Sequence, residues 1–129
     1  MINSGIYDYV NVLQKAADAS WLRQDVISNN IANADTPGYK RRDVNFESVL
    51  KQELFSSKYT TLDQKISNIH LDHLNVQSAP DYPNYSYRVD ENNVDPEQEN
   101  VALASNRIQY NALVDMISGK FAGIKSVIK

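Results

Sequence analysis

The stretch "NNIANADTPGYKRR" (residues 29–42) decides how this chain folds, because it joins a helical pattern to a tight turn. Apolar residues at a helical spacing, the last of them Ala34, run into its first half. Thr36 precedes a proline and is therefore pushed away from helical geometry. Pro37 and Gly38 are the preferred central pair of a type II turn, because proline presets its own φ and glycine accepts a positive one. The stretch predicts a helix end followed by a fixed turn.

Upstream of this stretch, apolar residues spaced three and four apart predict one long helix from about residue 6 to residue 33. No glycine or proline interrupts it, and at 1.5 Å per residue it would be about 42 Å long. Two polar residues, Ser20 and Gln24, interrupt an otherwise apolar row. The residues that we expect to pack, here called the N-terminal seam, are Ile6, Val10, Leu13, Ala17, Ile27 and Ile31.

A second long helix is predicted at the other end of the chain. Asp95 is a good N-cap, Pro96 suits the first helical position, and the acidic residues that follow favour the positive end of the helix dipole. Gly119 and Gly123 either allow the backbone of another helix to approach closely or only lower the local stability of the helix. The pattern leaves both interpretations open. The same spacing defines a C-terminal seam of Leu103, Tyr110, Val114, Ile117, Phe121, Ile124 and Ile128.

The middle of the chain carries no such seam. Residues 46–55 fit a short helix, whereas residues 56–93 are polar and broken by prolines. Near the end of this region, Tyr85, Tyr87 and Val89 alternate as in a short strand. We therefore expect an irregular insert of loops, with at most one β-hairpin.

These patterns predict a mainly α fold in one structural domain. Residues 1–36 form an N-terminal core helix and residues 94–129 a C-terminal core helix. The two helices pair as an antiparallel or coaxial coiled coil. Residues 37–93 supply the turn, a short helix and the small irregular loop or β-hairpin insert.

The chemistry-bearing residues are too sparse to predict a catalytic, cofactor-binding or metal site. The chain has no cysteine, which excludes thiolate nucleophiles and Cys-based metal sites. His70 and His73 share the spacing of two ligands on one helical face, but no third ligand accompanies them. No base lies in a pattern that would activate a serine or threonine. We expect no enzyme activity, no cofactor and no small-molecule substrate.

Charge likewise argues against nucleic acid as a partner. The net charge is −3, and the only basic run is Lys40, Arg41 and Arg42. Three cations followed at once by Asp43 give at most a weak, salt-sensitive contact with phosphates. We expect this run to be a solvated flank of the turn or to pair with a neighbouring subunit.

The sequence also contains no pattern typical of a transmembrane segment or of a cleaved secretory signal peptide. Its first residues, MINSGIYDYV, lack a basic n-region, a long apolar core and a small-residue cleavage site. No window approaches 18 uninterrupted apolar residues, so no transmembrane segment is expected. The expectation is an intracellular protein, or one exported by a route that leaves no such mark.

Two long segments of the chain resemble the bacterial flagellar rod and hook proteins. The N-terminal signature of that family, Asn-x-x-Asn-x-x-Thr-Pro-Gly-Tyr, is matched within "SNNIANADTPGYKRRDVNFESVL" (residues 28–50). Residues 92–129, which include "YNAL" and "SGKF", are similar to the closing helix of the proximal-rod members. Residues 56–91 show no useful match. The residues that match the signature are Asn30, Asn33, Thr36, Pro37, Gly38 and Tyr39.

The resemblance implies a structural subunit of the proximal rod in the flagellar basal body, located in the periplasmic space. Members of the family pass through the flagellar type III export channel without a cleaved signal and polymerise through their terminal helices. The implied partners are other copies and other proximal rod subunits, the rod–MS-ring adaptor protein and the export gate. A different rod subunit of the family, or a coiled-coil secretion chaperone or binding module, is the alternative. A chaperone would form a closed dimer, whereas a rod subunit would not close.

Overall fold

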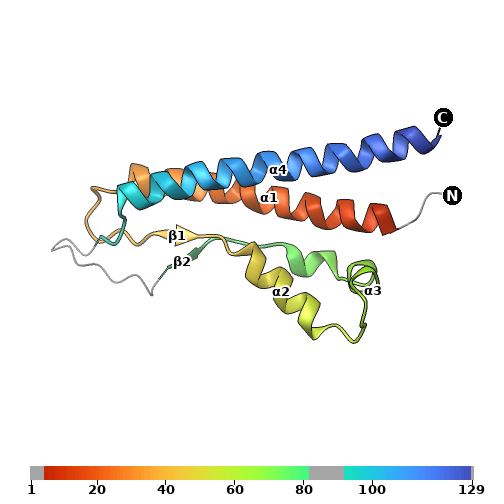
Figure 1. Cartoon of the computed structure of the whole chain (residues 1–129). Coiled ribbons are helices and arrows are strands. Elements are labelled where there is room, and N and C mark those ends of the chain that lie inside the picture. Colours follow the sequence, from red (N-terminus) through yellow and green to blue (C-terminus); the bar gives the residue numbers. More distant parts are fainter. Residues whose placement is uncertain (1–4, 82–91, 129) are drawn as a thin grey trace.

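The computed structural model describes residues 5–81 and 92–128, and it is mainly helical. Two long helices, α1 (Gly5–Ala32) and α4 (Pro96–Ile128), lie side by side and run in opposite directions (Figure 1). The prediction of a mainly α chain with long terminal helices is therefore confirmed. The elements between them are β1 (Arg42–Asp43), α2 (Phe46–Ser56), α3 (Leu62–Ser67), the 3-10 helix η1 (Leu71–Leu74) and β2 (Ala79–Pro80).

Helix α1 lies between α4 and the insert, so it buries two of its faces. One face carries Val12, Ala19 and Val26, spaced seven apart, and it packs on Val44, which follows β1, and on apolar residues of α2, α3 and η1. The other face carries Ser20, which is hydrogen-bonded to Asn106 of α4. This double burial explains why α1 is hydrophobic over more than one stripe. The insert is thereby held on the side of α1 that faces away from α4 (Figure 1).

The insert is more regular than its composition predicts. Helix α2 begins after Asn45, whose side chain accepts a hydrogen bond from the Ser48 N–H at 3.1 Å. Helix α3 begins after Thr61, whose hydroxyl accepts from the Gln64 N–H at 3.3 Å. A threonine followed three residues later by glutamine is a helix-start signal, and it is the local reason that α3 begins here.

The only strand pair among the described residues joins distant parts of the chain. Arg42 pairs with Pro80 and Asp43 with Ala79, in antiparallel register. This is a ribbon between the two ends of the insert rather than a hairpin with a tight turn. It ties the chain leaving α1 to the chain returning toward α4. The strand that the sequence predicts around residues 85–89 lies outside the described residues.

The turn after α1 has the geometry that the sequence predicts. Gly38 has φ = 74°, and the Tyr39 N–H donates to the Thr36 carbonyl at 3.2 Å. Because proline fixes a negative φ at Pro37, a positive φ at the next residue defines a type II turn. A Cβ on Gly38 would meet no atom within 4 Å, so backbone strain is the whole cost of adding one.

The substitution Gly38→Ala is expected to destabilise the folded chain by about 1–2 kcal/mol, the cost of a left-handed conformation for a residue with a Cβ. Gly119→Ala is the matched control, because it also adds a Cβ to open space but in a helix interior. It should stabilise the chain by about 0.5–1 kcal/mol. Urea unfolding of both variants measures the difference, and two changes of the same sign would contradict this account of the turn.

The contact between α1 and α4 has a polar centre. The Ser20 hydroxyl donates to Asn106 Oδ1 at 3.0 Å, and Asn106 Nδ2 donates to the Ser20 carbonyl at 2.9 Å. Both residues are buried. A single buried polar pair in an apolar seam fixes the register of two helices, because any slip leaves its donors and acceptors unsatisfied. The interruption of the N-terminal seam at Ser20 thus has a structural cause.

No helix within residues 5–81 and 92–128 combines enough length with enough hydropathy to span a bilayer.

Candidate functional site

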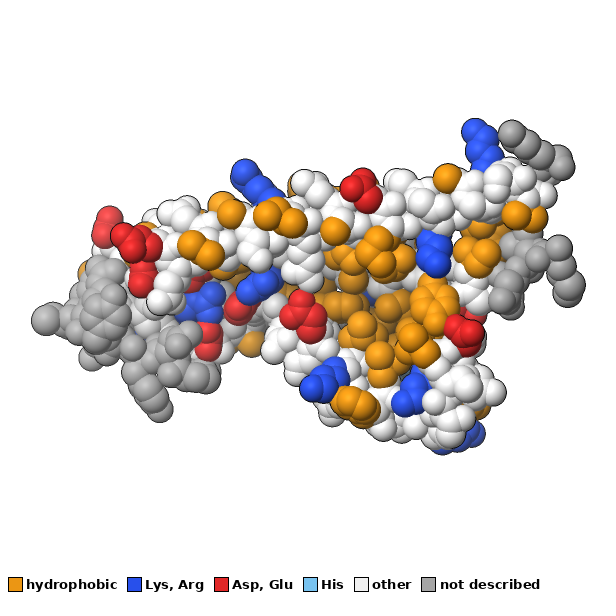
Figure 2. Space-filling view, in the orientation of Figure 1, with side chains coloured by type: hydrophobic (Ala, Val, Ile, Leu, Met, Phe, Trp, Pro, Cys, Tyr) orange, Lys and Arg blue, Asp and Glu red, His pale blue; other side chains and the backbone are white. Residues whose placement is uncertain are grey.

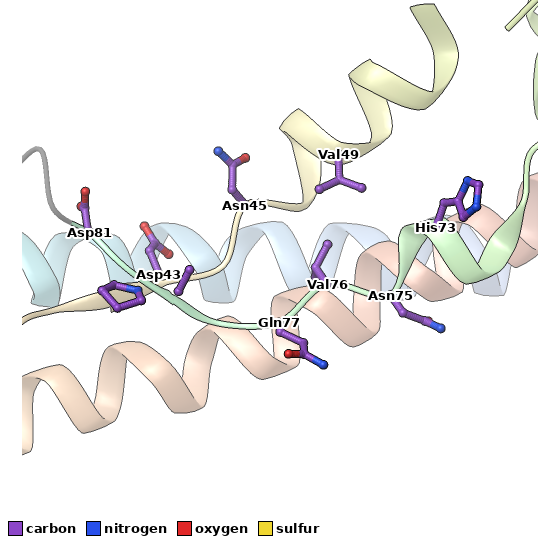
Figure 3. Close-up of a pocket in the computed structure, with 10 residues that line it drawn as sticks. Asp43, Asn45, Val49, His73, Asn75, Val76, Gln77 and Asp81 are labelled. Carbon is purple, nitrogen blue, oxygen red and sulfur yellow. The ribbon is translucent and has the colours of Figure 1, made fainter. Parts of the chain in front are cut away.

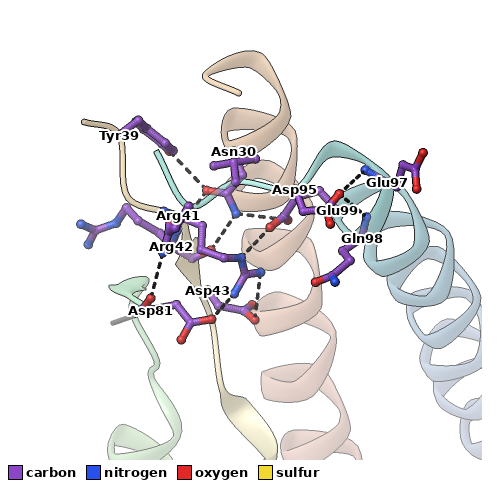
Figure 4. Close-up of polar contacts among 12 residues, drawn as sticks. Asn30, Tyr39, Arg41, Arg42, Asp43, Asp81, Asp95, Glu97, Gln98 and Glu99 are labelled. Atoms are coloured by element: carbon purple, nitrogen blue, oxygen red, sulfur yellow. Dashed lines mark hydrogen bonds and ion pairs between the residues drawn. The ribbon is translucent and has the colours of Figure 1, made fainter. Parts of the chain in front are cut away.

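A group of buried and half-buried polar residues lies where α1 ends, the turn follows and α4 begins (Figure 4). It draws on α1, the turn, β1, the residue after β2, the segment before α4 and the first turn of α4. We call it the polar corner, and it consists of Asn30, Tyr39, Arg41, Asp43, Asp81, Asn92, Asn93 and Glu99.

Asn30 is the centre of the polar corner and has no exposed surface. Its Nδ2 donates to the Arg42 carbonyl at 2.8 Å and to Glu99 Oε2 at 3.3 Å. Its Oδ1 accepts from the Arg42 N–H at 3.0 Å and from the Tyr39 hydroxyl at 3.3 Å. One side chain on α1 therefore holds the strand β1, the turn and the start of α4 together (Figure 4).

Asn92 satisfies the backbone at the end of α1. Its Nδ2 donates to the carbonyls of Asn33, Ala34 and Thr36 at 2.9, 3.0 and 2.7 Å. Its Oδ1 accepts from the Val94 N–H at 2.8 Å. These three carbonyls belong to residues that follow Ala32, the last residue of α1, and Asn92 supplies a donor to them from 56 to 59 positions away in the chain.

Arg41 carries the ion pairs of the polar corner. Its Nε lies 2.5 Å from Glu99 Oε1, its Nη1 pairs with Asp81, and its Nη2 is 3.6 Å from Asp43. Only 13% of the Arg41 side chain and 3% of the Glu99 side chain are exposed. Burial alone lowers the pKa of Arg41, but the hydrogen bonds and charges of these carboxylates outweigh burial and raise it. The guanidinium therefore stays charged, and it neutralises a carboxylate that is nearly inaccessible to water.

Asp43 connects the polar corner to the middle of α1. Arg23 Nε donates to its Oδ1 at 2.8 Å, and the Val44 N–H donates to the same oxygen at 2.8 Å. Burial alone raises the pKa of Asp43, but the bond from Arg23, the Val44 N–H and the charges of Arg23 and Arg41 outweigh it. The pKa of Asp43 is consequently held below its ordinary value of 3.8.

This lowered pKa makes a testable contribution to acid stability. A carboxyl whose pKa is depressed by folding stabilises the fold above its unfolded pKa, and the contribution is lost as the pH falls through the folded value. Asp43→Asn should therefore be less stable than the native chain at pH 7, and the gap should close below about pH 4. Asp18→Asn, at an exposed position on α1, is the control. Thermal unfolding from pH 7 to pH 2 tests this, and a gap that stays constant would rule it out.

The motif residues predicted from the sequence fall in and around the polar corner. Asn30 and Tyr39 belong to it, and Asn33 lies beside it. The Nδ2 of Asn33 donates to the Asn29 carbonyl at 2.8 Å, and its Oδ1 accepts from the Thr36 hydroxyl at 3.2 Å. The remaining motif residues, Pro37 and Gly38, are exposed and form the turn itself.

The seam residues are placed less uniformly. The N-terminal seam is buried or half-buried throughout. The C-terminal seam divides, since Leu103, Tyr110, Ile117 and Ile124 are buried or half-buried, whereas Val114, Phe121 and Ile128 are exposed by 39%, 51% and 65%. The exposed members form a row spaced seven apart that no part of the described chain covers.

Sequence reasoning missed most of the polar corner. Glu99 was expected only to favour the helix dipole, and Asn92 and Asn93 carried no recognisable pattern, because their partners are distant in the chain. The expectation that the basic run is solvated or pairs with another subunit is wrong for Arg41, whose half-buried side chain pairs with carboxylates of its own chain. Its proximity to Glu99 depends on the pairing of α1 with α4, which no local pattern encodes.

A second candidate is an open cavity of about 550 Å³ between the ribbon, α2 and η1 (Figure 3). Its lining combines apolar residues with six polar ones, among them Asp43, Asn45 and His73. The ring of His73 lies 5.1 Å from that of His70, and its Nδ1 is 3.1 Å from Glu53. Within residues 5–81 and 92–128, no group of three His, Asp or Glu side chains is arranged to hold a metal ion. The lining of the cavity includes no Ser, Thr, Cys or Lys side chain, and we take the polar corner as the stronger candidate site.

The polar corner can keep the elements that meet there in one fixed arrangement. Every buried side-chain nitrogen and oxygen in the described chain has a hydrogen-bond partner. Buried polar networks that are fully satisfied make a structure rigid and specify one arrangement. The polar corner therefore fixes the direction in which the insert leaves the helix pair.

Comparison with known proteins agrees with a structural site. Residues 11–40, which cover most of α1 and the turn, match the family model for the flagella basal body rod protein. The flagellar basal body rod protein FlgB of Bacillus subtilis is 36% identical over 124 residues, which span 90% of this chain and 89% of that protein. FlgB of Escherichia coli is 32% identical over 123 residues, spanning 90% and 89%. FlgB of Buchnera aphidicola is 33% identical over 123 residues, spanning 92% of each. Because these relatives are this similar over nearly their whole length, the chain belongs to the FlgB family of flagellar basal body rod proteins.

Proposed function

We propose that this chain is a non-enzymatic structural subunit of the proximal rod of a bacterial flagellum. It polymerises through its terminal core helices, residues 1–36 and 94–129, which pack as coiled coils with one another and with neighbouring subunits. Residues 37–93 form the part of the subunit that the polar corner holds at a fixed angle to this core.

The observation that carries the proposal is how little of α4 is buried against the rest of the chain. Of its 33 residues only Glu99, Asn106 and Ile124 are buried, and two of these are polar. Large apolar residues are exposed along the rest of the helix, including Val101 at 70% and Ile108 at 72%. Hydrophobic side chains along α4 are visible on the surface in Figure 2. A 33-residue helix with this much exposed apolar surface requires neighbours to complete its packing.

The proposed route to the rod is flagellar type III export, followed by assembly in the periplasmic space. Other proximal rod subunits, the rod–MS-ring adaptor protein and the export gate are the proposed partners. A fold held by polar contacts and two thin apolar clusters suits a chain that must unfold for passage and refold at its destination.

Deletion of the gene, combined with recovery of the tagged chain from purified basal bodies, tests the proposal. We expect the deletion strain to lack rods and the tagged chain to restore them and to copurify with the proximal end. Recovery at a distal position would identify a different rod subunit. A soluble, closed dimer that never enters the basal body would contradict the proposal and support a chaperone.

A further inference from the structure

Helix α4 presents two exposed rows that differ in charge. The outer row lies roughly opposite α1 and contains Glu97, Val101, Ile108 and Asp115. The flank row lies about a third of the way round the helix and contains Arg107, Val114, Phe121 and Lys125. All eight residues are exposed. Each row therefore combines two apolar side chains with two charges, which are negative on the outer row and positive on the flank row.

The charges of the two rows have the same spacing. Eighteen positions separate Glu97 from Asp115, and eighteen separate Arg107 from Lys125. Eighteen residues are five full helical turns, or about 27 Å. None of these four side chains forms an ion pair with another residue of the described chain. The acidic pair of one helix can therefore meet the basic pair of another helix at both points together.

We infer that the outer row of one copy docks on the flank row of a second copy, with the two α4 helices parallel and offset by ten residues. Ten positions separate Glu97 from Arg107, and ten separate Asp115 from Lys125. Ten helical residues correspond to an axial shift of about 15 Å. The inference rests on the proposed function and names the contact through which copies would pack.

The same offset interlocks the apolar side chains. It places Val101 opposite the interval between Arg107 and Val114, and Ile108 opposite the interval between Val114 and Phe121. Side chains that enter the gaps of a facing helix pack as knobs into holes. Exposed ion pairs alone contribute little free energy, so the apolar contact supplies the attraction and the charges select the register.

An antiparallel contact fits less well. It would pair Glu97 with Lys125 and Asp115 with Arg107, and the equal spacing of the charges allows this. However, it sets Ile108 directly against Val114, so that side chains meet head to head instead of interlocking. The parallel contact joins two different surfaces, the outer row of one copy and the flank row of the next. Each added copy therefore leaves one of these rows free for a further copy, and the assembly grows as an open helix.

Disulfide cross-linking tests the inference directly, because the chain has no cysteine of its own. In Glu97→Cys/Arg107→Cys the two positions of one chain are about 15 Å apart, too far to form a disulfide with each other. Oxidation of basal bodies built from this variant should produce a ladder of linked copies. The matched variant Glu97→Cys/Lys125→Cys should stay monomeric, and a dimer from it would overturn the parallel arrangement.

The charges give a second test that does not depend on cysteine geometry. Reversing Arg107 and Lys125 to glutamate should reduce the number of rods per cell at least tenfold, and adding Glu97→Lys and Asp115→Lys should restore it. Failure of restoration would overturn the register. If a Cys variant is present in basal bodies but forms no ladder, the inference fails and the proposed function stands. Absence of the native chain from basal bodies overturns both.

Discussion

Replacing Arg41 by methionine is expected to destabilise the folded chain by about 3–5 kcal/mol, the cost of breaking a buried pair by removing one partner. Glu99 would lose its cationic partner in a place where only 3% of its side chain meets water. The bond from Asn30 would be its remaining partner among those described above. A loss of this size is a large part of the stability of a domain this small. Urea unfolding followed by far-UV circular dichroism measures it.

Arg42→Met is the matched control for this prediction. The two arginines are adjacent, but Arg42 is exposed and donates to Ser78 across the ribbon. Its loss should cost no more than about 1 kcal/mol. In Arg41→Met/Glu99→Leu the stranded charge is also gone, so part of the stability should return. Equal losses of unfolding free energy in Arg41→Met and Arg42→Met would contradict the stabilising role given to the ion pairs of Arg41.

The second large effect is expected from Asn30→Asp, a change of a single side-chain group in the centre of the polar corner. It removes the donor to the Arg42 carbonyl and places a second carboxylate 3.3 Å from Glu99. At neutral pH the variant should lose about 3 kcal/mol, because a buried charge gains a like charge in place of a hydrogen bond. Chemical denaturation at pH 7 checks the size of this loss.

The pH dependence of Asn30→Asp provides its own control. Repulsion by Glu99 and burial both raise the pKa of an aspartate at this position, so the variant should regain stability relative to the native chain as the pH falls. Asn29→Asp adds the same charge one residue away, on the exposed side of α1. It should change the stability by less than about 0.5 kcal/mol. A loss for Asn30→Asp that is independent of pH would contradict the role given to Glu99.

The features that the sequence predicted well are local. The long terminal helices, the N-cap at Asp95 and the type II turn at Gly38 each depend on residues within one or two helical turns. Asp95 accepts from the Glu97 N–H at 3.0 Å, as its position before Pro96 predicts. Such signals act in the same way wherever the segment lies in the fold.

The polar corner was not predictable for the opposite reason. Asn30 and Glu99 are 69 positions apart, and Arg41 and Asn93 are 52 apart. Their contacts exist only after α1, the ribbon and α4 have come together. Asn106 illustrates the same limit, because the apolar spacing of the C-terminal seam passes over it although it is buried. Its partner Ser20 was visible only as an interruption of the other seam.

The central claim is that the fixed geometry of the polar corner is what this rod subunit requires. It is tested most directly by counting rods in cells whose only copy of the gene carries Asn30→Asp or Asn29→Asp. Electron microscopy of purified basal bodies gives the count, and immunoblots confirm equal synthesis of both variants. We predict complete rods with Asn29→Asp and few or none with Asn30→Asp. Equal numbers of complete rods in the two strains would contradict the account.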